Sequence, residues 1–196
     1  MATTYRVLPV APLRKGVSYM RPRQQVDDSA TLEQSALSVM TDFSQVTAQT
    51  IPAMESIEAA REKMIHHGVR MLLVCDDQSQ ILGIITATDL TSERPIWIIQ
   101  SQGIRHADVL VKDIMTPRER LEVLCIDDLQ TAKVGDIVAT LQGQGRQHAL
   151  VVERQSDRGQ VLRGMFSASQ IGRQLDMPIH TVPMARTFAD IAQLSD

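Results

Sequence analysis

The chain has 196 residues, of which 43% are apolar and 22% are charged, a composition typical of a soluble globular protein. A formal charge of −3 and only 3% aromatic residues argue against a surface for nucleic acid, by charge or by base stacking. The two cysteines are widely spaced and predict no disulfide framework. No apolar run approaches the roughly 20 residues that span a bilayer, so we expect no membrane contact and a cytoplasmic location.

Residues 1–36 carry basic side chains and no acid before Asp27. The prolines and polar residues among them favour an extended N-terminal arm or leader, although basic tails can also contact a partner. The five basic positions are Arg6, Arg14, Lys15, Arg21 and Arg23.

A helix is predicted next, because Ile57, Ala60 and Met64 fall on one face. Ser56 is its expected N-cap and Gly68 its expected stop. Two apolar strands should follow at residues 71–75 and 81–86, joined by an acidic turn.

Residues 92–110 should form a linker with a short helix beginning at Pro95, and we expect Trp97 to pack in the core. A second helical stripe runs through Val134, Ile137, Val138 and Leu141, and apolar strands follow within 148–152 and 161–166. The tail places apolar residues at helical spacing, which predicts that it covers the protein's own core or meets a second chain. Those tail residues are Met184, Phe188, Ile191 and Leu194.

The chain is two copies of one unit. "SVMT" (38–41) recurs as "DIMT" (113–116), "MIHHGVRMLLV" (64–74) aligns with "LQGQGRQHALV" (141–151), and "GIITATDL" (83–90) aligns with "GMFSASQI" (164–171). The apolar strand pairs predict sheets that are covered on both faces, and two packed copies can provide that cover.

These stretches resemble a tandem cystathionine-β-synthase (CBS) domain pair, or Bateman module. The resemblance implies an α/β (α+β) fold of two βαββα repeats, packed with pseudo-two-fold symmetry around a shared core and with two clefts between them. It divides the chain into an arm (1–36), repeat 1 (37–94), a linker (95–110), repeat 2 (111–176) and an amphipathic tail (177–196). It also implies a homodimer that binds adenosine-containing ligands.

The family's nucleotide signature, G-h-x-[ST]-x-x-[DNS], is complete in the first repeat. Gly83 would let a ligand approach the backbone, Ile84 would face the purine, and Thr86 would receive a phosphate. Asp89 could accept bonds from both ribose hydroxyls, but Thr and Asp are also ordinary capping residues. The predicted nucleotide cleft comprises Gly83, Ile84, Thr86, Thr88, Asp89, Ile126, Arg146, Gln147, His148 and Ala149.

In the second repeat a glutamine, Gln170, replaces the aspartate, so the charge-assisted bonds to a diol are lost. We expect that cleft to be weakened or empty, with Arg70 as its candidate for phosphate charge. Its predicted residues are Thr50, Arg70, Met71, Gly164, Met165, Ser167 and Gln170.

Other motifs point to no chemistry of their own. Adjacent helix positions face different directions, so His66 and His67 are expected to be solvated and no metal site is predicted. The sequence has no HExxH, CxxC pair, GxSxG or P-loop, and we expect no enzyme and no cofactor.

The leading hypothesis is a non-catalytic regulatory module that binds AMP, ADP or ATP and acts on an unknown effector protein. The alternative is a dimerising interaction module that no longer binds a nucleotide.

Overall fold

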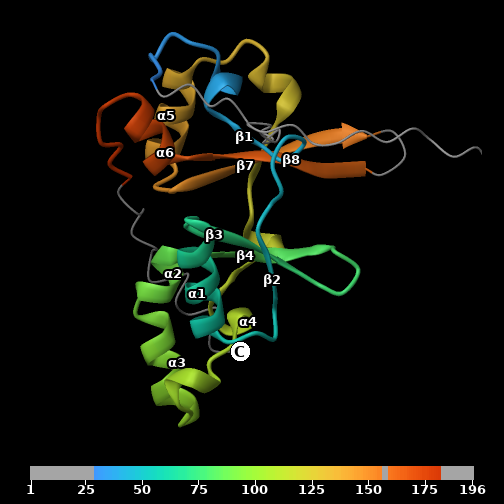
Figure 1. The fold of residues 1–196 in the computed structure, drawn as a ribbon, viewed down its shortest axis with the longest axis vertical. Helices are drawn as coiled ribbons and strands as arrows, with labels where there is room; N and C mark the ends of the chain where they lie inside the picture. Colours follow the sequence, from blue (N-terminus) through green and yellow to red (C-terminus); the bar gives the residue numbers. More distant parts are fainter. Residues whose placement is uncertain (1–28, 156–158, 182–196) are drawn as a thin grey trace, which may run out of the picture.

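Two four-stranded sheets face each other at the centre of the protein, and helices cover their outer faces (Figure 1). This computed structural model describes residues 29–155 and 159–181. The first sheet has the order β2 (Thr50–Pro52), β3 (Met71–Cys75), β4 (Ile81–Thr86), β5 (Thr116–Pro117). The second has the order β1 (Thr41–Asp42), β8 (Gly159–Ser167), β7 (His148–Gln155), β6 (Val123–Cys125).

Each sheet carries its own helices, which lie at opposite ends of the view in Figure 1. The first is covered by α1 (Ile57–His67), α2 (Ala87–Thr91), α3 (Arg94–Gln102) and α4 (Val111–Ile114). The second is covered by α5 (Val134–Gly143) and α6 (Ala168–Gln174). Short 3-10 helices occur at Ala36–Val39, His106–Asp108, Arg118–Arg120 and Ile126–Leu129. The order β2-α1-β3-β4-α2 recurs as β6-α5-β7-β8-α6, which confirms the predicted pair of βαββα units.

The helices begin and end where their capping residues predict. The Ser56 side chain accepts a bond from the N–H of Ala59, and Gly68 ends α1 with a φ of 63°. In α5 the buried residues are the predicted stripe of Val134, Ile137, Val138 and Leu141. These local signals are strong because each satisfies a backbone group or buries an apolar face.

Alternation along the strands divides the core into three clusters. In β3, Leu72 and Val74 face the helices of the first repeat, whereas Met71 and Leu73 face the other sheet. In β7, Leu150 joins Met71 and Leu73 in the cluster between the sheets, and Val151 packs under the helices of the second repeat. Each sheet is therefore covered on both faces, as its continuous apolar runs predict.

The two repeats exchange their first strands. β1 leads into the first repeat but pairs antiparallel with β8 of the second, and β5 leads into the second repeat but pairs with β4 of the first. The signature glycines permit this exchange. A Cβ on Gly164 would lie 2.5 Å from the carbonyl oxygen of Thr41, and one on Gly83 would clash with the carbonyl oxygen of Thr116.

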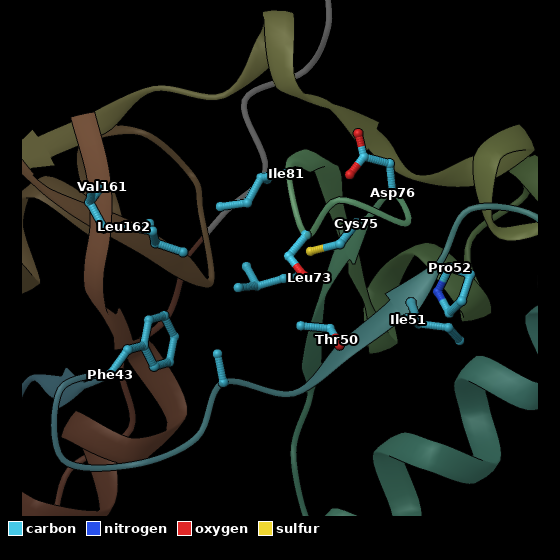
Figure 2. Close-up of a pocket in the computed structure, with 12 residues that line it drawn as sticks. Phe43, Thr50, Ile51, Pro52, Leu73, Cys75, Asp76, Ile81, Val161 and Leu162 are labelled. Atoms are coloured by element: carbon cyan, nitrogen blue, oxygen red, sulfur yellow. The ribbon is translucent and has the colours of Figure 1, made fainter. Parts of the chain in front are cut away.

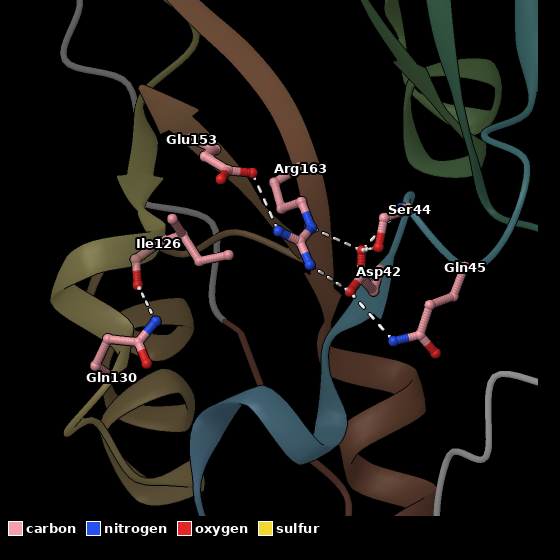
Figure 3. A network of polar contacts seen from close by, with 7 residues as sticks. All are labelled: Asp42, Ser44, Gln45, Ile126, Gln130, Glu153 and Arg163. Atoms are coloured by element: carbon pink, nitrogen blue, oxygen red, sulfur yellow. Dashed lines mark hydrogen bonds and ion pairs between the residues drawn. The ribbon is translucent and has the colours of Figure 1, made fainter. Parts of the chain in front are cut away.

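An ion pair between a buried aspartate and a half-buried arginine fastens the exchanged strand β1 (Figure 3). The guanidinium of Arg163 in β8 donates from Nε to Asp42 Oδ1 at 2.9 Å and from Nη2 to Oδ2 at 3.0 Å. Its Nη1 donates to Glu153 at 3.0 Å, and the backbone N–H and hydroxyl of Ser44 donate to Asp42. The hydrogen bonds from Arg163 hold the pKa of Asp42 well below its usual range, despite burial.

The linker helix α3 differs from its prediction at one residue. It contains Pro95 in its first turn, as expected, but Trp97 is 61% exposed, and the buried residues of the helix are Pro95 and Ile98. A helix of nine residues turns only one narrow stripe to the core, and that stripe passes through Pro95 and Ile98. Over the described part of the chain, no helix is long and apolar enough to span a membrane.

Candidate functional site

A pocket of about 300 Å³ opens between the repeats at the end of β8 where the second signature lies. We call it the Gln170 cleft. The first repeat supplies the loop that follows β1 and the turn from α1 into β3, and the second supplies the end of β8 and the start of α6. Its walls are Thr41, Phe43, Val46–Gln49, His67–Met71, Leu73, Met165, Ser167, Ser169, Gln170 and Arg173.

Five of the seven residues predicted for this second cleft line it, namely Arg70, Met71, Met165, Ser167 and Gln170. Met165 and Ser167 lie on the same face of β8 because alternate residues of a strand share a side, and Met71 of β3 faces them from the other sheet. The other two lie elsewhere. Thr50 lines a neighbouring pocket, and Gly164 packs against the exchanged strand β1.

The polar side chains of the second signature are turned to this cleft. The Thr41 hydroxyl donates to Gln170 Oε1 at 3.1 Å, so the exchanged strand β1 positions the amide. The hydroxyls of Ser167 and Ser169 lie 3.0 Å apart, and Ser167 makes no side-chain cap to its own helix. These side chains present hydroxyl and amide groups of the kind that bind ribose and phosphate.

Basic side chains stand at the mouth of the cleft. Arg70 and Arg173 both reach solvent and line the same pocket from different repeats. Nearby, burial and then the positive charge of Arg70 lower the pKa of His148 to about 4, so this imidazole is neutral at pH 7. An anion bound beside Arg70 would offset part of that positive charge.

The signature of the first repeat is used differently. Asp89 Oδ2 accepts bonds from the Thr86 N–H at 2.8 Å and from its hydroxyl at 2.6 Å, while Asp89 N–H donates back to that hydroxyl at 3.3 Å. The other carboxylate oxygen lies 3.9 Å from Arg94 Nη1. This arrangement is a capping box, the ordinary structural role that the sequence left open for these residues.

The remaining residues predicted around Asp89 are dispersed. Gly83 faces Thr116 of β5, so the close approach at this glycine is made by a strand, and Ile84 packs in the cluster between the sheets. Thr88 is exposed on α2, Arg146 pairs with Glu122 at 3.0 Å, and Gln147 Nε2 donates to Thr181 at 2.6 Å. Ile126 and Ala149 lie in the core of the second repeat, because Ala149 is on the helix-facing side of β7.

Some residues of the Gln170 cleft were missed by the sequence-based prediction. Arg173 carries a detectable signal, since it follows Ser169 by four positions and so shares its helix face. Thr41, Phe43 and Val46–Gln49 carry none, because their position depends on the strand exchange.

No three metal-binding side chains come together among the residues that the structure describes. His66 and His67 are exposed, and their rings contact each other edge to face with centroids 4.9 Å apart.

Comparison with known proteins agrees with this architecture. Residues 36–95 match the sequence model of the CBS domain, and no curated protein matches the chain. An uncharacterized conserved protein from Pyrococcus horikoshii is 19% identical with a TM-score of 0.50, and the match covers 72% of this chain and 92% of that one. The CBS-domain protein ATU1752 from Agrobacterium tumefaciens is 18% identical with a TM-score of 0.50, covering 69% and 93%.

CBSX2 of Arabidopsis thaliana, solved in complex with AMP, is 20% identical with a TM-score of 0.49, covering 72% and 94%. At identities of 18–20% the structural likeness shows the fold alone. Residues 36–95 therefore match the CBS domain in sequence, and the described chain has the fold of a tandem CBS pair.

Proposed function

We propose that the protein is a non-catalytic regulatory module that binds an adenine nucleotide, AMP, ADP or ATP, in the Gln170 cleft. The observation that carries the proposal is a pocket lined by both repeats, with two arginines at its mouth and an apolar interior. Its volume of about 300 Å³ lies at the lower end of the range of about 300–1,000 Å³ for small-molecule sites, as expected for a mononucleotide.

The lining supplies each part of a nucleotide with a suitable neighbour. Arg70 and Arg173 provide charge for phosphate, and the hydroxyls of Ser167 and Ser169 can donate to its oxygens. Met71, Met165 and Leu73 form an apolar wall for the base. Gln170 can accept one ribose hydroxyl by displacing that of Thr41.

The Asp89 site supports this assignment less well. Its carboxylate would have to give up two hydrogen bonds to Thr86 before binding a diol, and Arg94 already balances its charge. Each lost bond to a charged group costs about 1.5–3 kcal/mol, which a ribose would have to replace.

Regulation follows from the position of the ligand. Because the nucleotide would contact both repeats, it would favour the relative orientation in which both sets of contacts form. A partner protein that distinguishes the two orientations would thereby be coupled to nucleotide concentration.

Titration calorimetry of nucleotide-stripped protein with AMP, ADP and ATP tests the proposal. Arg70→Ala and Arg173→Ala should each weaken AMP binding about tenfold or more, because each removes a charge from the phosphate. Arg61→Ala is the matched control, since Arg61 is an exposed arginine of α1 that pairs with its neighbour Glu58 at 3.2 Å and lines neither pocket between the repeats. Absence of binding heat and of a melting-temperature change with all three nucleotides would exclude the function.

A second function, dimerisation without a ligand, is favoured by exposed apolar side chains on the helices of the first repeat. Ile96 and Trp97 on α3 are 58% and 61% exposed, and Ile65 on α1 is 65% exposed. Light scattering over a dilution series, with Trp97→Glu as the variant, would separate the two hypotheses. A dimer that persists at low concentration, is lost in Trp97→Glu and ignores nucleotides would support the second.

A further inference from the structure

A second pocket of about 350 Å³ lies between the repeats, beside the Gln170 cleft (Figure 2). We call it the Cys75 pocket. The first repeat supplies β2, the end of β3 and the start of β4, and the second repeat supplies the outer part of β8. Its lining is Phe43, Ala48, Thr50, Ile51, Pro52, Leu73, Cys75, Asp76, Ser79, Ile81, Val161 and Leu162.

The two pockets meet at a common wall. Phe43, Ala48 and Leu73 line both of them. All three side chains are apolar, and none ties the wall down through a side-chain hydrogen bond. The two pockets are therefore neighbours along the interface between the sheets.

The chemistry of the lining differs between the two pockets. The Gln170 cleft carries Arg70 and Arg173, whereas no lysine or arginine is among the described residues that line the Cys75 pocket. The charged residue in this described lining is Asp76, whose Oδ1 already accepts the N–H groups of Gln78 at 2.9 Å and Gln80 at 2.8 Å. A second phosphate is therefore disfavoured there, and an uncharged apolar group is favoured.

This gradient fixes the direction of a bound nucleotide. With its phosphate at the arginines, its base lies toward the opposite end, against the wall of Phe43, Ala48 and Leu73. A substituent carried on the base would then point into the Cys75 pocket. AMP itself would leave that pocket without an apolar occupant.

We propose that the ligand of this protein is an adenine nucleotide whose base carries an apolar substituent, and that the substituent fills the Cys75 pocket. The proposal rests on the proposed function, because it requires the phosphate end in the Gln170 cleft. The pocket walls Leu73, Ile81 and Leu162 would cover the substituent from both repeats.

The thiol of Cys75 gives a direct readout of occupancy. Burial and then the carboxylate of Asp76 raise the pKa of Cys75, so alkylation by iodoacetamide should be followed at about pH 8.5, where more thiolate forms. Cys125 is an internal control, because it is also partly exposed and lines neither pocket. Mass spectrometry of the two cysteine peptides then reports each site separately.

The test compares AMP with N6-benzyl-AMP by calorimetry and by protection from alkylation. The benzyl compound should bind at least about tenfold more tightly, because its ring is removed from water. It should also slow the alkylation of Cys75 and not that of Cys125. In Cys75→Phe, where the new side chain occupies the pocket, the gain should vanish while AMP binding persists, and Cys125→Phe should retain the gain.

The outcomes separate the two proposals. If AMP binds but N6-benzyl-AMP binds no better and leaves Cys75 alkylation unchanged, this inference is overturned and the nucleotide function stands. If neither compound binds, both are overturned. Protection of Cys75 in the unmodified protein decides the matter even if Cys75→Phe does not fold.

Discussion

Neutralising Asp42 should destabilise the protein by detaching the exchanged strand β1. The Asp42 side chain is 9% exposed and accepts five hydrogen bonds from Arg163, Ser44 and Gln45. Asp42→Asn keeps the size of the side chain but removes the charge and places an N–H₂ donor opposite another donor. Bonds to a charged group contribute about 1.5–3 kcal/mol each, and Arg163 keeps Glu153 and some solvent, so we expect a loss of about 2–3 kcal/mol.

Glu153→Gln is the matched control for this variant. Glu153 binds the same guanidinium through one contact at 3.0 Å, but its side chain is 40% exposed. An ion pair that water screens in this way contributes less than about 1 kcal/mol. The comparison therefore asks whether burial and bidentate geometry, not the mere presence of a charge pair, stabilise β1.

Urea unfolding at pH 7, followed by circular dichroism, measures both losses, and the melting temperature of Asp42→Asn should fall by about 5–10 °C. A double-mutant cycle with Arg163→Met should give a coupling energy above about 1 kcal/mol. The reasoning is refuted if Asp42→Asn is no less stable than Glu153→Gln, or if the cycle shows no coupling.

The same pair sets a pH dependence. The pKa of Asp42 is lower in the folded protein than in the unfolded chain, where it is about 3.9, so the unfolded state binds the proton first as pH falls. The stabilisation by the carboxylate should be complete above about pH 4 and be lost progressively below it. Asp42→Asn should lack this acid-dependent loss.

Three further predictions concern the signatures and the cleft. Gly83→Ala and Gly164→Ala should each lower the free energy of unfolding in urea by about 1–3 kcal/mol, since a Cβ would displace a backbone carbonyl of the exchanged strand. Gly143→Ala at the end of α5 is the control and should be neutral or stabilising, because a Cβ there meets nothing within 4 Å. His148→Gln should remove part of the fall in the free energy of unfolding between about pH 6.5 and 4. The pKa of His148 is about 4 in the folded protein and higher in the unfolded chain, so the unfolded state gains the proton first as pH falls. A variant with the same pH dependence as the unmodified protein would contradict the burial of this imidazole. Asp89→Ala should lose about 1 kcal/mol through its capping box and leave AMP binding intact, and a selective loss of AMP binding would instead move the nucleotide to the Asp89 site.

Much of the fold could be predicted from the sequence because its signals are local. Ser56, Gly68 and Pro95 mark helix ends by satisfying backbone groups, and the stripe through Val134 and Leu141 needs only one helix to be recognised. Trp97 was mispredicted because aromatic size favours burial on average, while the contacts of a single short helix decide which residue is buried.

The strand exchange was not predictable by the same means. β1 and β5 have two residues each, too few for any periodicity, although "SVMT" and "DIMT" mark their positions as equivalent. Gly83 and Gly164 do carry a signal, but the sequence alone does not say whether a ligand or a strand needs the space.

The two signatures differ in how their polar groups are already used, and this difference is the reason for placing the proposed nucleotide in the Gln170 cleft. In the first repeat the carboxylate of Asp89 satisfies the helix start itself, so the complete signature closes on its own backbone. In the second, Gln170 is drawn to Thr41 of the exchanged strand, and Ser167 makes no cap to its helix. The degraded signature consequently leaves hydroxyl and amide groups along a pocket that both repeats line. A match to a binding motif shows which polar groups the chain carries, whereas the local hydrogen bonds determine which of those groups can still bind a ligand.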